Sequence, residues 1–215
     1  MDPSLYVVLD REASGSRDLA DVLEATLAGG CRMVQLREKT WESGRLLPLA
    51  RRLGESARRA GAIFIVNDRV DLALAVGADG VHLGQDDLPA AVARPLLRPG
   101  MILGVSTHSL EQARRARTDG ADYVAVGSMF STSMKAGFEL VGPELLARVR
   151  PDVPQPLIGI GGITVDNLDS VIRAGADGVA VISAVCAAAD PRAATERLLE
   201  RIRAARDLTG SGRPL

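Results

Sequence analysis

The sequence predicts a single (β/α)8 barrel, the TIM-barrel class of α/β fold. Three observations support this fold: short apolar runs alternate with longer helical patterns, eight such pairs fit into the 215 residues, and a Gly-Ala-Asp motif recurs at every second pair. Alternation of this kind is typical of parallel strands joined by right-handed crossovers. We expect one domain over residues 1–208 and a flexible tail at 209–215.

The predicted strands are short, apolar and rich in Val and Ile, as expected for parallel strands that are buried on both faces. They cover residues 5–9, 33–36, 63–66, 80–83, 102–105, 123–126, 157–160 and 178–182. Between them, apolar residues recur with the helical period. They predict helices at 17–28, 44–60, 70–76, 88–97, 110–118, 143–148, 165–174 and 191–206.

The repeated motif joins a helix to the next strand. It reads Gly77-Ala78-Asp79, Gly120-Ala121-Asp122 and Gly175-Ala176-Asp177, with a fainter copy at Gly29-Gly30-Cys31. The first Gly ends the helix, where a left-handed residue is needed. A repeat every two βα units favours a closed barrel over an open sheet, and no Gly-x-Gly-x-x-Gly follows the first strand. Helix-to-strand junctions lie on the stability face, so we expect the three aspartates to be structural.

Composition and charge exclude several function classes. The chain is 47% apolar and 25% charged with a net charge of −1, which argues against a nucleic-acid partner. No uncharged run is long enough to cross a bilayer, and the first residues lack the basic region of a signal peptide. Cys31 and Cys186 form neither a disulfide framework nor a metal-spaced pair. These features predict a soluble cytoplasmic protein without a membrane partner.

Only two of the 26 cationic side chains are Lys, at Lys39 and Lys135. In a chain so biased toward Arg, a Lys is expected to persist where the planar guanidinium fork does not fit. Both lysines are therefore candidates for a functional site. Chance survival of two surface lysines is the alternative.

Polar residues follow the second, third and fourth strands, at the end of the barrel where such folds place their chemistry. Alternation puts Gln35, Arg37 and Lys39 on one side of the chain, from barrel interior to rim. Two cations and an amide suit an anion with a polar ring beside it, although a solvated charged loop would look similar. Asp68 and Asp87 follow adjacent strands and suit a Mg²⁺ ion that holds a diphosphate. Helix capping is the alternative for both aspartates.

The later strand ends indicate a second anion site. Glycines and hydroxyls in Gly159-Ile160-Gly161-Gly162-Ile163-Thr164 and Ile182-Ser183 predict the phosphate cradle common in these barrels. A long loop at 127–137 is rich in hydroxyls and is expected to bind or cover a ligand. We expect His82, inside a strand, to be a hydrogen-bonded core residue. For His108, at the mouth, a site role and a polar-loop role are equally open. Ser109 is expected to cap the following helix.

These motifs together resemble the thiamine-phosphate synthase family over residues 5 to 205. The resemblance rests on Gln35-Leu36-Arg37-Glu38-Lys39, Asn67-Asp68, His82-Leu83-Gly84-Gln85-Asp86-Asp87, Leu103-Gly104-Val105-Ser106 and Gly159-Ile160-Gly161-Gly162-Ile163. It implies a transferase of thiamine biosynthesis. The family joins 4-amino-2-methyl-5-(diphosphomethyl)pyrimidine to a thiazole phosphate, and releases thiamine phosphate and diphosphate by a Mg²⁺-assisted dissociative substitution. Residues 1–208 would be the catalytic domain, and a homo-oligomer is compatible with this assignment.

The resemblance also implies roles for individual residues. Asp68 and Asp87 match the Mg²⁺ ligands; Arg37, Lys39 and Lys135 match contacts to the diphosphate and, with Ser106, the catalytic residues. The substrate-binding set implied by the resemblance comprises Gln35, Asn67 and Ser106 for the pyrimidine, Gly162, Ile182 and Ser183 for the thiazole phosphate, and Glu38, Thr132, Ser133 and Met134 beside them.

One segment departs from the family. Its loop after strand six usually reads Pro-Thr-x-Thr-Lys, whereas this chain has Ser131-Thr132-Ser133-Met134-Lys135. That difference keeps two other hypotheses open. The protein would be similar to the thiazole tautomerases, with His108 as acid and base, or it would be an inactive barrel that binds a thiamine intermediate. The paired aspartates and both lysines favour the synthase.

Overall fold

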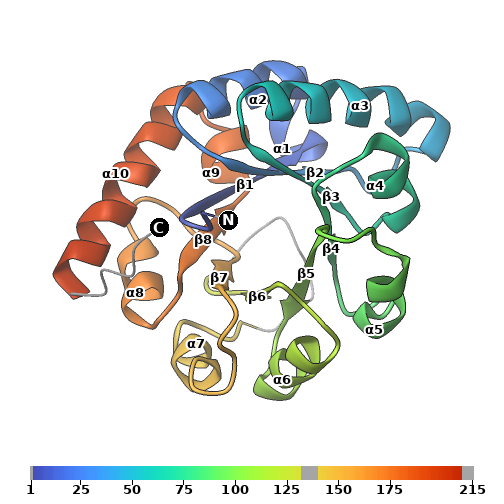
Figure 1. The fold of residues 1–215 in the computed structure, drawn as a ribbon. Coiled ribbons are helices and arrows are strands. Elements are labelled where there is room, and N and C mark those ends of the chain that lie inside the picture. The colour runs from blue at the N-terminus through green and yellow to red at the C-terminus, as the bar shows by residue number, and fades with distance from the viewer. Residues whose placement is uncertain (1, 132–139, 210–215) are drawn as a thin grey trace.

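The computed structural model describes residues 2–131 and 140–209. Within these residues, eight parallel strands close into a barrel in the order in which they follow in the chain (Figure 1). The strands are β1 (Leu5–Asp10), β2 (Met33–Arg37), β3 (Ile63–Asn67), β4 (Gly80–Leu83), β5 (Ile102–Thr107), β6 (Tyr123–Val126), β7 (Leu157–Ile160) and β8 (Gly178–Val181). The predicted (β/α)8 fold is confirmed.

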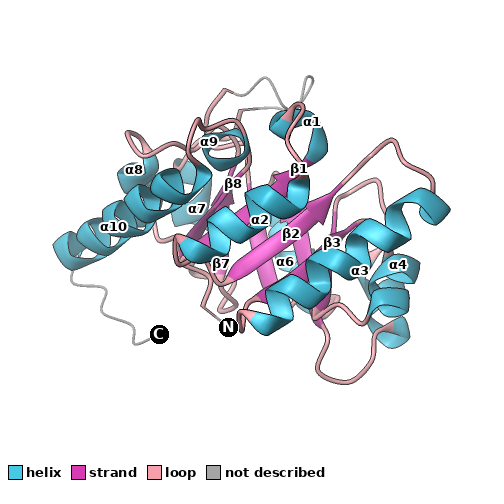
Figure 2. Cartoon of the chain, turned by 90° about the horizontal axis from the view of Figure 1, so that it is seen from above, coloured by secondary structure: helices cyan, strands magenta, loops and turns pink. Residues whose placement is uncertain are grey.

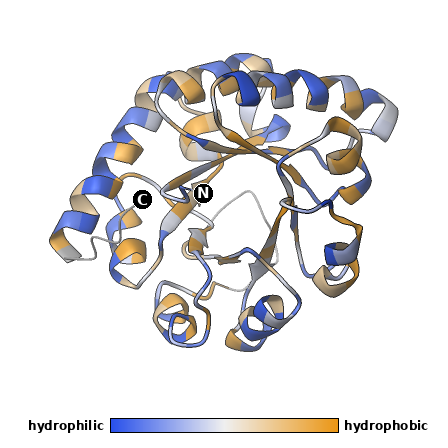
Figure 3. Ribbon diagram, in the orientation of Figure 1, coloured by the Kyte–Doolittle hydropathy of each residue, from blue (hydrophilic) through white to orange (hydrophobic). Residues whose placement is uncertain are grey.

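The helices surround the barrel and turn their apolar faces toward the strands (Figures 1 and 3). They are α1 (Arg11–Ser14), α2 (Leu19–Ala28), α3 (Ser43–Arg59), α4 (Val70–Val76), α5 (Ala90–Ala93), the 3₁₀ turn η1 (Arg94–Leu96), α6 (Leu110–Thr118), α7 (Glu144–Val149), α8 (Leu168–Arg173), α9 (Ser183–Cys186) and α10 (Pro191–Thr209). Figure 2 shows α1 and α9 together at the end of the barrel opposite the N-terminus. Within the described part of the chain, no helix combines the length and apolar character needed to cross a bilayer.

Some predicted helix limits are wrong. The single helix expected over 88–97 is the short α5 followed by η1, because Pro95 has no N–H to donate into an α-helix. Helix α2 begins at Leu19 rather than residue 17, since the Asp18 carboxylate accepts from Ala20 N and caps it. Helix α8 begins at Leu168, because a turn comes first in which Asn167 Oδ1 accepts from Thr164 N.

Two four-residue helices, α1 and α9, were not predicted, because one turn is too short to show a helical period. At the other end of the chain, α10 continues to Thr209. The remainder of the tail predicted at 209–215 lies outside the described residues.

The aspartates of the repeated motif are structural, as predicted. Asp79, Asp122 and Asp177 each accept a 2.8 Å hydrogen bond from the backbone N–H of Phe64, Leu103 and Leu157, respectively. Each of those amides lies at or beside the start of the preceding strand. The motif therefore ties neighbouring strands together at the end of the barrel opposite the candidate site, which accounts for its repetition.

Residues alternate along each strand between the helix-covered outside and the barrel interior. On β1, for example, Leu5, Val7 and Leu9 pack under the helices, whereas Tyr6 packs inside the barrel. Gly104 faces the same interior, where an added Cβ would lie 2.0 Å from the Tyr123 ring. Large side chains thus fill the barrel centre, and ligands are confined to its mouth.

Candidate active site

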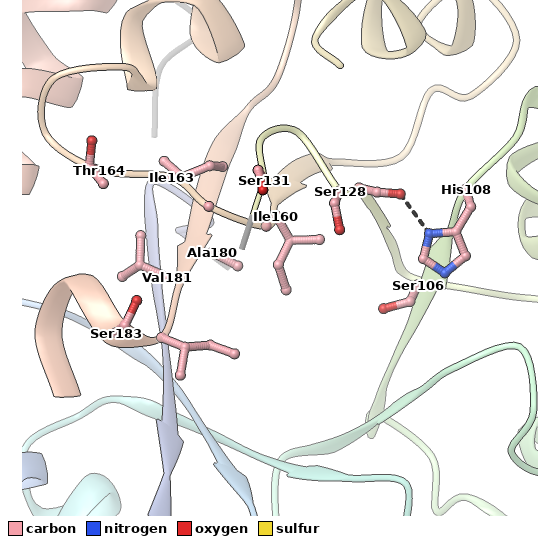
Figure 4. Close-up of a pocket in the computed structure, with 14 residues that line it drawn as sticks. Ser106, His108, Ser128, Ser131, Ile160, Ile163, Thr164, Ala180, Val181 and Ser183 are labelled. Atoms are coloured by element: carbon pink, nitrogen blue, oxygen red, sulfur yellow. Dashed lines mark hydrogen bonds between the residues drawn. The ribbon is translucent and has the colours of Figure 1, made fainter. Parts of the chain in front are cut away.

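A cavity of about 250 Å³ opens at the carboxyl ends of β5 to β8 (Figure 4). Of the predicted site residues, it brings together Ser106, Gly162, Ile182 and Ser183. Its other lining residues are His108, Gly127, Ser128, Ser131, Ile160, Gly161, Ile163, Thr164, Ala180 and Val181. The wall therefore combines apolar side chains with hydroxyl groups, a composition typical of small-molecule sites.

The two glycines after β7 allow this wall to form. Gly162 has a φ of +65°, and a Cβ there would lie 2.6 Å from the Ser131 carbonyl oxygen. A Cβ at Gly161 would lie 2.8 Å from the Ser128 backbone. The loops after β6 and β7 consequently pack backbone against backbone, and Phe130 N donates to Gly161 O at 3.0 Å. This glycine-rich wall faces Ser183, the first residue of α9, across the cavity.

His108 lines the same cavity in a set orientation. Its Nδ1 donates to the Gly127 carbonyl oxygen at 2.6 Å, and its backbone N donates to Gln112 Oε1. The carbonyl contact places a proton on Nδ1. Ser109 caps α6 by accepting from Gln112 N, as predicted. His82, in contrast, is buried and hydrogen-bonded inside the barrel, which confirms the core assignment.

The residues at the carboxyl end of β2 and just after it run from barrel interior to rim, as their alternation predicts. Gln35 is buried, the Arg37 side chain is 14% exposed, and the Lys39 side chain is 48% exposed. Arg37 pairs with Asp10 at the end of β1. Glu38 is turned aside, because its carboxylate accepts from Arg11 at 2.5 Å and from the Thr40 backbone at 2.6 Å.

The carboxyl groups of Asp68 and Asp87 meet beside Lys39. They are in hydrogen-bonding contact, and Lys39 Nζ also binds Asp68. Asp68 lies at the end of β3 next to Asn67, with a left-handed φ of 61° that Asp tolerates better than most residues. Neither aspartate caps a helix: Asp87 accepts from Gly84 N at 2.7 Å, and the residues that precede α4 and α5 are Arg69 and Pro89. The capping alternative is therefore wrong.

This contact shifts the pKa values of the two carboxyl groups in opposite directions. Burial, followed by the hydrogen bond to Asp87, raises the pKa of Asp68 from 3.8 to about 6. Burial also opposes ionisation of Asp87, but hydrogen bonds from Asp68 and the Gly84 amide hold its pKa below the usual range. Ionising both carboxyl groups is therefore unfavourable without a nearby positive charge, which a bound cation would supply.

The donor set fits Mg²⁺. This ion uses one or two carboxylates and takes its remaining ligands from water and substrate phosphate. Within residues 2–131 and 140–209, no group of three or more His, Cys, Asp or Glu side chains gathers to enclose a metal. Asp68 and Asp87 would thus hold an ion that depends on a phosphorylated ligand to complete its shell.

Four predicted residues, Thr132, Ser133, Met134 and Lys135, lie outside the described residues. Other site residues were missed. Asp10 pairs with Arg37, and its position at the carboxyl end of β1 could have indicated a site residue from the sequence. Ser128 and Thr164 line the cavity from loops already marked by their hydroxyls and glycines. Gln85 Nε2 donates to Ser106 O at 2.6 Å, a contact between loops that the sequence does not reveal.

A closed (β/α)8 barrel with a glycine-rich cavity, paired carboxylates and cations at its mouth has the architecture of barrel enzymes for phosphorylated small molecules. The sequence model for thiamine monophosphate synthase matches residues 5–185. A thiamine-phosphate synthase of Moorella thermoacetica is 52% identical over 204 residues, 94% of this chain and 97% of that protein. One from Roseiflexus castenholzii is 49% identical over 91% of this chain and 86% of its own.

A solved structure agrees. Thiamine phosphate pyrophosphorylase from Pyrococcus furiosus superposes with a TM-score of 0.87 at 39% identity, over 95% of this chain and 97% of that one. The chain belongs to the thiamine monophosphate synthase family.

Proposed function

We propose that the protein condenses 4-amino-2-methyl-5-(diphosphomethyl)pyrimidine with a thiazole phosphate, and releases thiamine phosphate and diphosphate. It is a transferase of the pyrimidinylmethyl group. The observation that carries this proposal is the presence of two different anion sites at one barrel mouth: the cations and carboxylates after β2 to β4, and the glycine-rich cavity after β5 to β8. Membership of the family supports the reaction.

The diphosphate would bind at the first site. Arg37 and Lys39 supply positive charge there, with Lys135 from the loop after β6 as the further cation implied by the family resemblance. Asp68 and Asp87 would hold Mg²⁺, which when bound stabilises negative charge on the diphosphate as a Lewis acid. Each of these two cations pairs with an aspartate, but the Arg37 side chain is 14% exposed against 48% for Lys39, so Arg37 is the more confined of the two.

The pyrimidine would lie between Gln35, Asn67 and Ser106, toward the barrel interior. The thiazole phosphate would occupy the cavity, with its phosphate on the Gly162 backbone, Ile182 and Ser183. Thr132 and Ser133 belong to the loop expected to cover it, and Met134 stands where the family has a hydroxyl residue. The carboxylate of Glu38 serves Arg11 and Thr40 in the described structure, so we expect it to shape the loop rather than touch the substrate.

This reaction depends on stabilising the negative charge of the departing diphosphate more than on a general base. The bond between the pyrimidine's methylene carbon and the diphosphate oxygen breaks first, and its electron pair leaves with the diphosphate. The thiazole nitrogen then supplies the electron pair of the new C–N bond. Arg37 and Lys39 stabilise the leaving diphosphate. The apolar wall of Ile160, Ile163 and Val181 limits access of water to the pyrimidinylmethyl cation that remains.

The test is substrate stoichiometry. The purified protein with Mg²⁺ and both substrates is expected to release one diphosphate for each thiamine phosphate formed, with little release when the thiazole phosphate is omitted. Diphosphate release without thiamine phosphate would contradict the condensation. Proton exchange into the thiazole phosphate alone would instead favour the tautomerase alternative through His108.

Mg²⁺ as the particular cation, a cytoplasmic location and a homo-oligomeric state stay predictions. So does the absence of nucleic-acid and membrane partners. The cation is tested by comparing Mg²⁺ with Ca²⁺, which takes more ligands at longer distances.

A further inference from the structure

Five polar side chains form a continuous hydrogen-bonded chain inside the barrel, below the cavity. The order is Gln35, Tyr6, Tyr123, His82 and Ser106, from β2, β1, β6, β4 and β5, and all five are buried. The two tyrosine hydroxyls are 2.9 Å apart, the Tyr123 hydroxyl is 2.8 Å from His82 Nδ1, and His82 Nε2 is 2.8 Å from Ser106 Oγ. Gln35 Nε2 contacts the Tyr6 hydroxyl. Both ends belong to residues expected to hold the pyrimidine.

The middle of this chain is held in one arrangement. The ring of Tyr6 meets that of Tyr123 edge-on at 5.8 Å, and His82 stacks on Tyr123 at 5.5 Å. Gly104 leaves the space for the Tyr123 ring, since a Cβ there would lie 2.2 Å from the hydroxyl oxygen. Neither tyrosine can change rotamer without displacing packed neighbours.

Such a chain has a direction. A tyrosine hydroxyl has one hydrogen to donate, and a neutral imidazole has one donor and one acceptor nitrogen. Burial raises the pKa of Tyr6 and of Tyr123, so both keep their hydrogens. With His82 neutral, reversing the link between the two tyrosines therefore requires the histidine tautomer and the link to Ser106 to reverse as well. It also leaves the Tyr6 hydrogen without a partner unless the Gln35 amide turns.

The amide of Gln35 sets that direction. Its Nε2 can only donate, and it donates to Tyr6. With His82 neutral, we infer that Tyr6 then donates to Tyr123 and that Tyr123 donates to His82 Nδ1. His82 Nε2–H then donates to Ser106 Oγ. Among the described residues no hydrogen bond reaches Gln35 Oε1. The two ends are left with different characters: at Gln35, the acceptor oxygen Oε1 beside the second Nε2 hydrogen, and at Ser106, on the cavity wall, a hydroxyl hydrogen.

We propose that Tyr6, Tyr123 and His82 are positioning residues that lock the Gln35 amide as an acceptor and the Ser106 hydroxyl as a donor, and thereby select an aminopyrimidine over an oxopyrimidine. This inference rests on the proposed function for the pyrimidine substrate. An amino group donates to Gln35 Oε1, and a ring nitrogen accepts from Ser106. A ring carbonyl facing Gln35 Oε1 would place two acceptors together, and the amide would have to turn and lose its Nε2 bond to Tyr6 to accommodate it.

The test compares the 4-amino substrate with its 4-oxo counterpart. The selectivity, the ratio of kcat/KM values with thiazole phosphate and Mg²⁺, is measured for the wild type, Tyr6→Phe and Tyr123→Phe. Each variant removes one oxygen and keeps the ring. Thr107→Val is the matched control, because it removes a buried hydroxyl next to Ser106 that bonds to Ala125 O instead of the chain.

We expect the wild type to prefer the amino substrate by about 100-fold or more, since a site built for one hydrogen-bond pattern rejects its inverse. In both Tyr→Phe variants this ratio should fall about tenfold, because the KM for the aminopyrimidine rises while the KM for thiazole phosphate is unchanged. Thr107→Val should keep the ratio. Equal selectivity in the wild type and both tyrosine variants would overturn the proposal.

Calorimetric binding of the two pyrimidine diphosphates separates this proposal from the proposed function. If the wild type binds the amino compound but forms no thiamine phosphate, the reaction assignment is wrong, and the ratio of Kd values still tests the chain. If it binds neither compound, both proposals are overturned.

Discussion

Gly162→Ala tests the cavity wall after β7. The left-handed φ of +65° costs an Ala roughly 1 kcal/mol. The added Cβ would also lie 2.6 Å from Ser131 O and 2.8 Å from Phe130 O, and backbone atoms cannot rotate away. Displacing the β6 loop costs about 1–3 kcal/mol more, as overpacking does.

Gly61→Ala is the matched control. Its φ of +65° is the same as that of Gly162, but nothing lies within 4 Å of the added Cβ. The difference between the two variants therefore reports the contact with the β6 loop. We expect the Tm of Gly162→Ala to fall roughly 5 °C below that of Gly61→Ala.

The kinetic consequence is confined to one substrate. A shift of the wall by about an ångström should raise the KM for thiazole phosphate about tenfold to 100-fold, because positioning at this scale is sensitive to such displacements. The KM for the pyrimidine diphosphate should change less than about twofold, since its site lies after β2 to β4. Steady-state kinetics with each substrate varied in turn measures both. An unchanged KM for thiazole phosphate, with a Tm equal to that of Gly61→Ala, would refute the reasoning.

Three further predictions concern stability. The pKa of Asp68 is about 6 in the folded protein against an ordinary value of 3.8, so the stability of the metal-free protein falls as the pH rises from about 4 through 6. Asp68→Asn should therefore raise the Tm more at pH 8 than at pH 5. An equal gain at both pH values would contradict this prediction. Asp10→Asn leaves Arg37, whose side chain is only 14% exposed, without its carboxylate partner. This should lower the free energy of unfolding, measured with denaturant, by about 3 kcal/mol, and an unchanged value would contradict the prediction. Gly104→Ala should cost about 3 kcal/mol by the same assay, and Tyr123→Leu in that background should recover part of it.

The parts of the site that lie along one strand or on neighbouring strands were predictable. Gln35, Arg37 and Lys39 alternate with a period of two, so their order from interior to rim follows from strand geometry. Asp68 and Asp87 follow adjacent parallel strands, and parallel strands end at the same edge. Prediction worked here because each inference needed only local periodicity and the order of strands.

Contacts made across the closed barrel were not predictable. Tyr6 and Tyr123 are 117 residues apart, and their hydroxyls meet only because both side chains extend into the barrel centre over Gly104. The Arg37–Asp10 pair likewise depends on the register between β1 and β2, which places the two residues opposite each other. Side-chain reach and strand register are properties of the folded barrel, and no pattern in the sequence encodes them locally.

Thiamine phosphate formation in two neighbouring variants tests the central claim most directly. Asp87→Asn removes a carboxylate that meets Asp68, whereas Asp86→Asn removes the same charge from an exposed residue one position earlier. With both substrates and Mg²⁺ present, we expect the wild type and Asp86→Asn to form thiamine phosphate at similar rates, and Asp87→Asn to be slower by about 100-fold or more. Equal rates for the two variants would contradict a cation site at Asp68 and Asp87, and no product from the wild type would contradict the proposed reaction itself.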